Sequence, residues 1–282
     1  MLHTPIRPLL AAALLVGLVL IPLRPAYADE LSDAYLLPEL FEVMATEGQR
    51  SVLAEDTAPL NGGIRAQFVQ EVEEIYTPSR IEDAFVSVLQ EELQNRPDLR
   101  ADALDFARST LGQRVLRLEI SARTAMLEDE VDEAARRALM DAREAPSDSA
   151  LGQRLALVRD RIDANDLVDL NVSLGLNTSY AYYRGLYAEG AVDGLSQEDL
   201  LQIIWAQEGE IRAETVDWIE AFFLMAYQPL DDDEFQALID YAQTPLADRF
   251  NQAMFQAFDA VFTDISRSIG QALGRRLQAE EL

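Results

Sequence analysis

Residues 245–274 read PLADRFNQAMFQAFDAVFTDISRSIGQALG, and they predict one long amphipathic helix. Apolar side chains recur there at steps of three and four residues, whereas Asn251, Asp259 and Arg267 occupy the other side. The resulting stripe must be buried by other helices. Burial of one such Phe contributes about 2 kcal/mol, so packing outweighs helix propensity. The stripe consists of Phe250, Met254, Phe258, Val261, Phe262, Ile265 and Ile269.

The same periodicity continues through the rest of the chain, so we expect an all-α helical bundle. Prolines fall between the periodic segments, where a missing N–H does little harm. Ser196 followed by Asp199 is typical of a capping box at a helix start. The predicted helices span 37–56, 64–76, 79–94, 99–109, 111–142, 148–163, 166–189, 196–207, 210–227, 231–243 and 245–274.

An internal similarity links two junctions between helices. Residues 105–114 (DFARSTLGQR) match residues 240–249 (DYAQTPLADR). In each stretch a short helix ends near an aromatic residue, and a hydroxyl side chain can then cap the next helix. We expect the aromatic ring to pack into the bend, so that its replacement by Ala costs about 3 kcal/mol. The matched residues are Phe106, Ser109, Gly112 and Arg114 in the first copy and Tyr241, Thr244, Pro245 and Arg249 in the second.

This similarity predicts two tandem, divergent helical repeats, over residues 29–142 and 151–282, joined by a linker at 143–150. We interpret a further LGQR at 151–154 as coincidental, because no aromatic residue precedes it at the matching place. We expect Arg114 and Arg249 to hold neighbouring carboxylates, given the surplus of acidic residues.

The pattern aromatic-x-x-(Ser/Thr)-Pro-x-Gly, between amphipathic helices, resembles the bacterial domain-of-unknown-function family numbered twenty fifty-nine. Residues 241–247 have Ala247 where Gly is usual, and residues 106–112 keep Gly112 but have Thr110 where Pro is usual. The resemblance implies a small all-helical periplasmic module, present here in two divergent copies. The family carries no established activity, so the resemblance implies no catalytic residue.

Residues 1–28 have the features of a secretory signal. An apolar run over 9–23 is followed by Ala-Tyr-Ala at 26–28. A membrane anchor is the alternative, but this run is interrupted by Pro22 and is shorter than the ~20 residues of a spanning helix. We therefore expect cleavage after Ala28, a periplasmic mature protein, and no transmembrane span after cleavage.

The chain is strongly acidic. It has 50 acidic and 23 basic residues, and removal of residues 1–28 leaves 21 Arg and a formal charge of −29. Such a surface repels phosphate, so we expect no nucleic-acid partner, and anionic lipid headgroups are disfavoured. A cationic partner or bound cations would suit this charge, but high solubility in salt explains it as well.

Beyond residue 28 the sequence has no His, Cys or Lys. Imidazole bases, thiolate nucleophiles, Schiff-base lysines and the usual zinc sites are excluded. We assign no catalytic residue and expect no metal or cofactor. The acidic runs at 128–133, within a predicted helix, and at 231–234, at a helix start, lack the pattern of a calcium loop. Paired carboxylates can still hydrolyse glycosides, so a carboxylate-dependent hydrolase of cell-envelope glycans is the alternative function.

An aromatic cluster is the strongest candidate binding site. Tyr180, Tyr183 and Tyr187 share one helix face, with Arg184 beside them. Tyrosine combines flat apolar area with a hydroxyl group, which suits a peptide or a sugar, although packing explains the cluster equally well. The sequence therefore favours an exported, non-enzymatic module that binds an unknown protein, peptide or envelope component.

Overall fold

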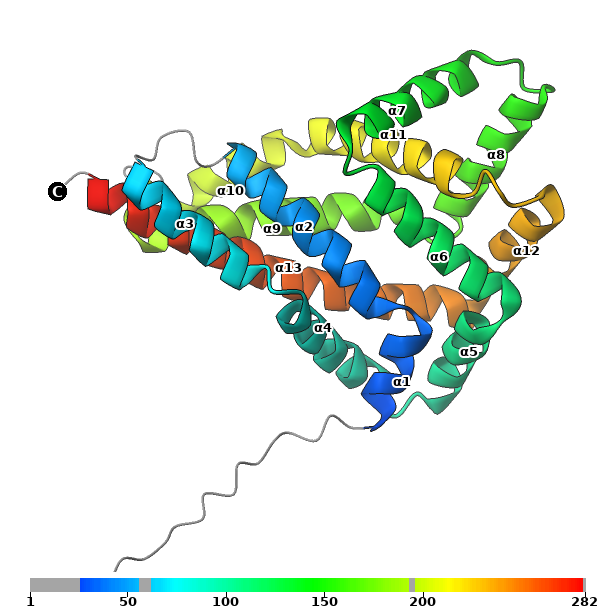
Figure 1. Ribbon diagram of the computed structural model, residues 1–282, viewed down its shortest axis with the longest axis horizontal. Helices are drawn as coiled ribbons and strands as arrows, with labels where there is room; N and C mark the ends of the chain where they lie inside the picture. Colours follow the sequence, from blue (N-terminus) through cyan, green and yellow to red (C-terminus); the bar gives the residue numbers. More distant parts are fainter. Residues whose placement is uncertain (1–25, 56–61, 193–195, 281–282) are drawn as a thin grey trace, which may run out of the picture.

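The computed structural model describes residues 26–55, 62–192 and 196–280 (Figure 1). Over these ranges it contains thirteen helices and no strand, which confirms the all-α expectation. Most of the expected secretory signal lies outside the described residues. The helices are α1 (Ala26–Ala34), α2 (Leu37–Glu55), α3 (Gly62–Ile75), α4 (Pro78–Leu93), α5 (Pro97–Arg108), α6 (Thr110–Ala125), α7 (Asp129–Glu144), α8 (Ala150–Asp163), α9 (Leu167–Ala188), α10 (Gln197–Ala206), α11 (Glu208–Ala226), α12 (Asp232–Ala242) and α13 (Pro245–Glu280).

The long C-terminal helix α13 extends along the long axis of the molecule (Figure 1). It packs along α9 on one side and against α3, α4 and α5 on others. Phe250, Val261, Ile265 and Ile269 are buried, as the stripe predicted. Phe258 and Phe262 in the same stripe are only half-buried, because the space in front of them is a cavity.

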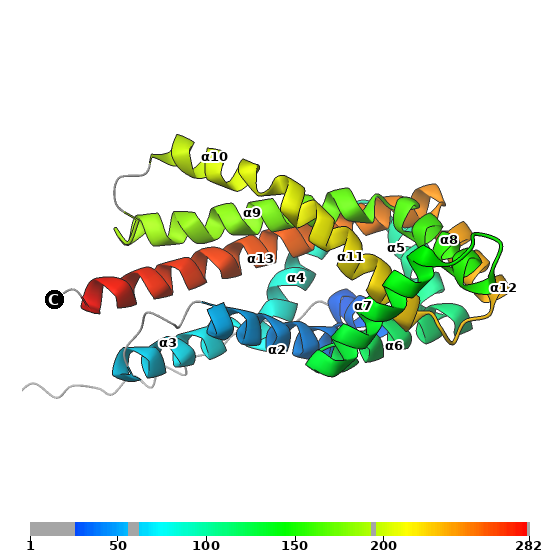
Figure 2. The ribbon, with the colours of Figure 1, turned by 90° about the horizontal axis from the view of Figure 1, so that it is seen from above.

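Glycines allow α9 and α13 to approach closely along their shared length (Figure 2). A Cβ on Gly185 of α9 would lie 2.3 Å from the Arg267 carbonyl oxygen, and one on Gly270 of α13 would lie 2.1 Å from that of Tyr182. No side chain fits at either position without separating the helices. The α9–α13 pair therefore depends on glycine at these two places.

Two separate core clusters hold the other helices together. The first core cluster joins α1–α5 to α13 and includes Phe41, Phe68 and Phe85. The second core cluster joins α6–α8 to α11 and α12 and includes Tyr227 and Phe235. Each cluster takes residues from both predicted repeats, so the two halves of the chain are interleaved in space.

The prediction of a single helix over 111–142 is wrong. The chain forms two helices there, α6 and α7, which run in different directions (Figure 1). At the break the N–H groups of Leu127 and Glu128 donate to carbonyls only three residues earlier, which ends α6. The acidic run then supplies the first turn of α7, where negative charge is stabilised by the helix dipole. The run at 128–133 therefore opens a helix rather than lying within one.

The hydroxyl caps expected at the repeated junctions are present. The Ser109 hydroxyl accepts the N–H of Gly112 at 2.9 Å, and the Thr244 hydroxyl accepts that of Ala247 at 3.2 Å. Ser149 caps α8 in the same manner, accepting the N–H of Gly152 at 3.1 Å. The LGQR sequence at 151–154 thus begins a helix with the same capping geometry as the one at 111–114.

Candidate ligand-binding cavity

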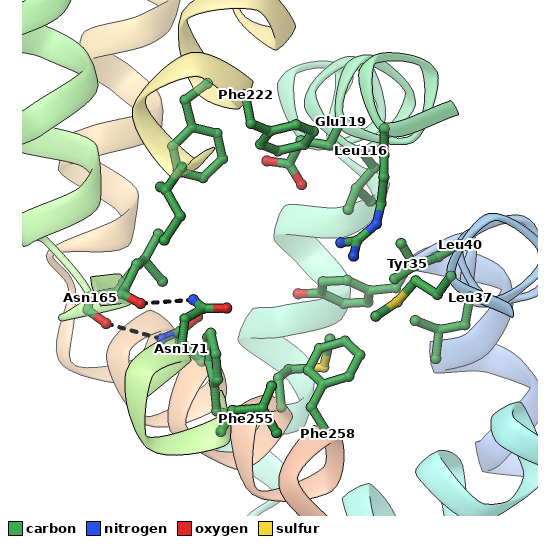
Figure 3. A pocket seen from close by; sticks show the side chains of 18 of the residues that line it. Tyr35, Leu37, Leu40, Leu116, Glu119, Asn165, Asn171, Phe222, Phe255 and Phe258 are labelled. Atoms are coloured by element: carbon green, nitrogen blue, oxygen red, sulfur yellow. Dashed lines mark hydrogen bonds between the residues drawn. The ribbon is translucent and has the colours of Figure 1, made fainter. Parts of the chain in front are cut away.

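A cavity of about 610 Å³ lies between the two core clusters (Figure 3). Its walls come from α2, α5, α6, α8, α9, α11, α12 and α13, together with Tyr35 in the turn between α1 and α2 and Tyr76 after α3. The volume lies within the ~300–1,000 Å³ range of small-molecule sites. A space of this size can hold a small-molecule ligand.

The walls are mainly aromatic and aliphatic. Neighbouring rings stack within one wall instead of reaching across the space: Trp218 on Phe222 at 5.0 Å, and Phe258 on Phe262 at 6.1 Å. The first pair lies on α11 and the second on α13, so neither pair crosses the space between these helices. The aromatic lining residues of α11 and α13 are Trp218, Phe222, Phe223, Phe250, Phe255, Phe258 and Phe262.

One carboxylate, that of Glu119 on α6, points into the cavity from the wall that also holds Leu116 and Phe222 (Figure 3). Protein atoms surround it, although the cavity leaves the side chain half-buried. Burial raises the pKa of Glu119 above its usual range, and the hydrogen bond from Tyr227 and the charge of Arg161 only partly oppose this. The other carboxylate in the described lining, that of Glu47, is ion-paired.

A polar network holds Glu119 in place. The fully buried Tyr227 donates its hydroxyl hydrogen to Oε1 of Glu119. Arg161 lies near both groups, donates to Oδ1 of Asn165 at 2.9 Å, and covers the Phe223 ring at 5.6 Å. Burial and the neighbouring Glu119 charge raise the pKa of Tyr227, so its phenol stays protonated and remains a donor.

The lining reaches solvent beside an ion pair between α6 and α2. Arg123 donates from Nε to Glu47 at 2.8 Å, and the two side chains are 23% and 37% exposed. The Arg123 guanidinium also lies 5.4 Å from the centre of the Trp218 ring. This pair therefore ties the two walls together at the rim.

The tyrosine cluster predicted from the sequence lies outside the cavity lining. Tyr180 and Tyr183 are half-buried on α9, Arg184 lies over the Tyr180 ring at 5.8 Å, and Tyr187 is 45% exposed. Tyr183 also packs against the first core cluster. These four residues of α9 therefore do not contribute to the cavity.

The repeat residues divide between packing, capping and surface. Phe106 and Tyr241 line the cavity. Arg114 forms an ion pair with Glu234, as expected, and also donates to the Pro229 carbonyl at 2.6 Å. Arg249 is exposed and makes no ion pair with any residue that the structure describes, so the expectation for it is wrong.

Sequence reasoning missed Glu119 and Arg161. A signal was present for Glu119, because it lies four residues after Val115 and three before Ala122, both of which are buried. An acid on the apolar stripe of a helix is a candidate for a buried functional group. With 50 acidic residues in the chain, this single position did not stand out.

Across residues 26–55, 62–192 and 196–280, no cluster of three acidic or other metal-ligating side chains is placed to hold a metal ion. In the same ranges, no helix combines the length and hydropathy that a membrane span needs. No family model, curated protein or solved structure matches the chain. The resemblance to the bacterial family therefore stays a prediction.

Proposed function

We propose that this protein binds a small molecule with a hydrocarbon or aromatic body and one polar group. The supporting observation is the cavity itself: about 610 Å³ between two well-packed clusters, walled by rings, with a few polar groups gathered near Glu119. An apolar space with few convergent polar groups is the usual form of a small-molecule site. Among the partners considered from the sequence, which were a protein, a peptide or an envelope component, the cavity favours a small amphiphilic component of the envelope.

The hydrolase alternative has weaker support. Glycoside hydrolysis needs two carboxylates about 5–10 Å apart, one of them free to act as base or nucleophile. Of the two acids in the described lining, Glu47 is engaged by Arg123. The aromatic walls also offer few partners for sugar hydroxyls.

Export is a further part of the proposal. The residues that follow the expected cleavage point are anchored in the fold: Glu30 pairs with Arg100 and Arg108 at 2.7 Å, and Ser32 donates to the buried Glu82 at 2.6 Å. A mature chain that starts at Asp29 would keep all of these contacts. N-terminal sequencing of the secreted or periplasmic protein should read from Asp29, and an uncleaved Met1 would contradict export by cleavage.

Binding is tested with the uncharged fluorophore N-phenyl-1-naphthylamine. We expect saturable enhancement of its emission by the folded mature chain at a stoichiometry of one. Leu116→Trp, which fills the cavity from α6, should weaken binding by about tenfold or more, equivalent to ~1.4 kcal/mol. The matched control is Leu151→Trp, at a 40% exposed position outside the lining. Equal binding by both variants would contradict the proposal.

A further inference from the structure

The carboxylate of Glu119 offers a hydrogen-bond acceptor to the cavity. Oε1 of Glu119 takes the hydrogen bond from Tyr227, and no residue that the structure describes donates to Oε2. The carboxylate faces the open space (Figure 3). A ligand that reaches this atom must therefore offer a hydrogen-bond donor if Glu119 is charged.

The neighbouring cation is turned toward protein. Arg161 donates to Asn165, contacts Tyr227, and lies over the Phe223 ring. Its Nε is fully buried and has no hydrogen-bond partner. Arg161 offsets only part of the cost of burying the Glu119 charge, since the pKa of Glu119 remains raised. The site therefore favours a ligand with a positive charge beside Glu119 over a ligand with a negative charge.

The aromatic walls of the cavity and the net charge of the protein also favour a positively charged ligand. The faces of aromatic rings attract cations, and eight Phe and Trp residues line the cavity. The chain's formal charge of −27 draws cations toward the protein and repels anionic amphiphiles. Arg123, the other basic group in the lining, is neutralised by Glu47.

We propose that the ligand carries a cationic amine, whose N–H groups bind the free oxygen of Glu119 while its apolar body fills the aromatic cavity. This inference rests on the proposed function. It adds the charge of the ligand's polar group and names Glu119 as the residue that selects it.

The test compares three probes that share one alkyl chain: dodecylammonium, dodecanol and dodecanoate. Each is titrated into the mature protein by calorimetry, below its micelle concentration or solubility limit and at high salt, so that screening suppresses binding of amines to the acidic surface. We expect one dodecylammonium per chain, bound about tenfold or more tightly than dodecanol, with dodecanoate weakest. Glu119→Gln should remove the preference for the amine and leave dodecanol binding unchanged within about threefold.

Glu133→Gln is the matched control, because it removes the same charge from a 70% exposed side chain on α7. It should keep the preference for the amine. Dodecanoate binding as tightly as dodecylammonium, or an unchanged amine preference in Glu119→Gln, would overturn the inference while leaving the cavity as a binding site. Failure of all three probes to bind would instead overturn the proposed function. Circular dichroism of Glu119→Gln checks that the variant is folded.

Discussion

The rings of Phe106 and Tyr241 lie face to face, with 3.8 Å between their centroids and 4° between their planes. One ring belongs to the end of α5 and the other to the end of α12, so the two junctions with similar sequences meet in space. Tyr241 also donates to Asp102 at 3.2 Å, which orients its ring. Together the rings form part of the cavity lining, and each is only half-buried.

This stack predicts coupling between the two positions. Phe106→Ala and Tyr241→Ala should each cost less than the ~3–5 kcal/mol of a fully enclosed aromatic residue, because one side of each ring borders open space. A double-mutant cycle by urea denaturation should give a coupling free energy of about 1 kcal/mol. Strictly additive effects would show that the rings do not interact in solution.

Glu119 predicts a pH dependence of stability. Its pKa is raised in the folded protein from an ordinary value of 4.5, so the folded state holds this proton more tightly than the unfolded state does. The free energy of unfolding therefore loses a contribution as pH rises from about 4.5 through the folded pKa. Glu119→Gln removes that loss. The stability of the variant relative to the original chain should rise over this window and then level off, as measured by urea denaturation from pH 4 to pH 8. A difference that does not vary with pH would contradict the burial of this charge.

The buried residue Glu220 connects α11 to α7 and α8 through ion pairs. The residue is 4% exposed, and its carboxylate binds Arg143 of α7 at 2.6 Å and Arg159 of α8 at 2.7 Å. Glu220→Gln should destabilise the fold by about 2 kcal/mol, somewhat below the usual range for breaking a buried pair, because both arginines are partly exposed. The exposed pair Arg137–Glu133 supplies the control, since Glu133→Gln should cost under ~0.5 kcal/mol. If thermal unfolding showed similar losses of stability in Glu220→Gln and Glu133→Gln, this role for Glu220 would be contradicted.

The close approach of α9 and α13 is tested by glycine substitution. Gly270→Ala places a Cβ against the Tyr182 carbonyl and should destabilise the protein by about 1–3 kcal/mol. Gly209→Ala, in α11, meets no atom within 4 Å and should be neutral or stabilise by up to ~1 kcal/mol. Denaturant midpoints should therefore move in opposite directions or differ clearly. Equal midpoints would mean that the helices are farther apart than described.

Much of the helical layout follows from the sequence because each element carries its own signals. The stripe from Phe250 to Ile269 gave α13, and Ser196 with Asp199 forms the expected capping box on α10. The break between α6 and α7 was missed because it has neither Pro nor Gly, and the acidic run reads equally well inside a helix or at its start.

The cavity could not be predicted because it depends on how two distant clusters face each other. The spacing of Phe258 and Phe262 predicts burial, but not that the opposite wall stands back from them. Gly185 and Gly270 offered a usable signal, since glycine inside a helix often marks a close backbone contact. The spacing of the tyrosines on α9 predicts a shared helix face, but they lie outside the lining.

Two tryptophans allow the position of a bound ligand to be measured directly. Trp218 lines the cavity, whereas Trp205 is 65% exposed and lies outside the lining. Trp205→Phe keeps only the cavity tryptophan, and Trp218→Phe keeps only the surface one. Titration with a terminally brominated dodecanol, which quenches indole emission on contact, should give saturable quenching at Trp218 and only weak, non-saturating quenching at Trp205. Saturable quenching at Trp205 alone, or none at Trp218, would contradict ligand binding in the cavity.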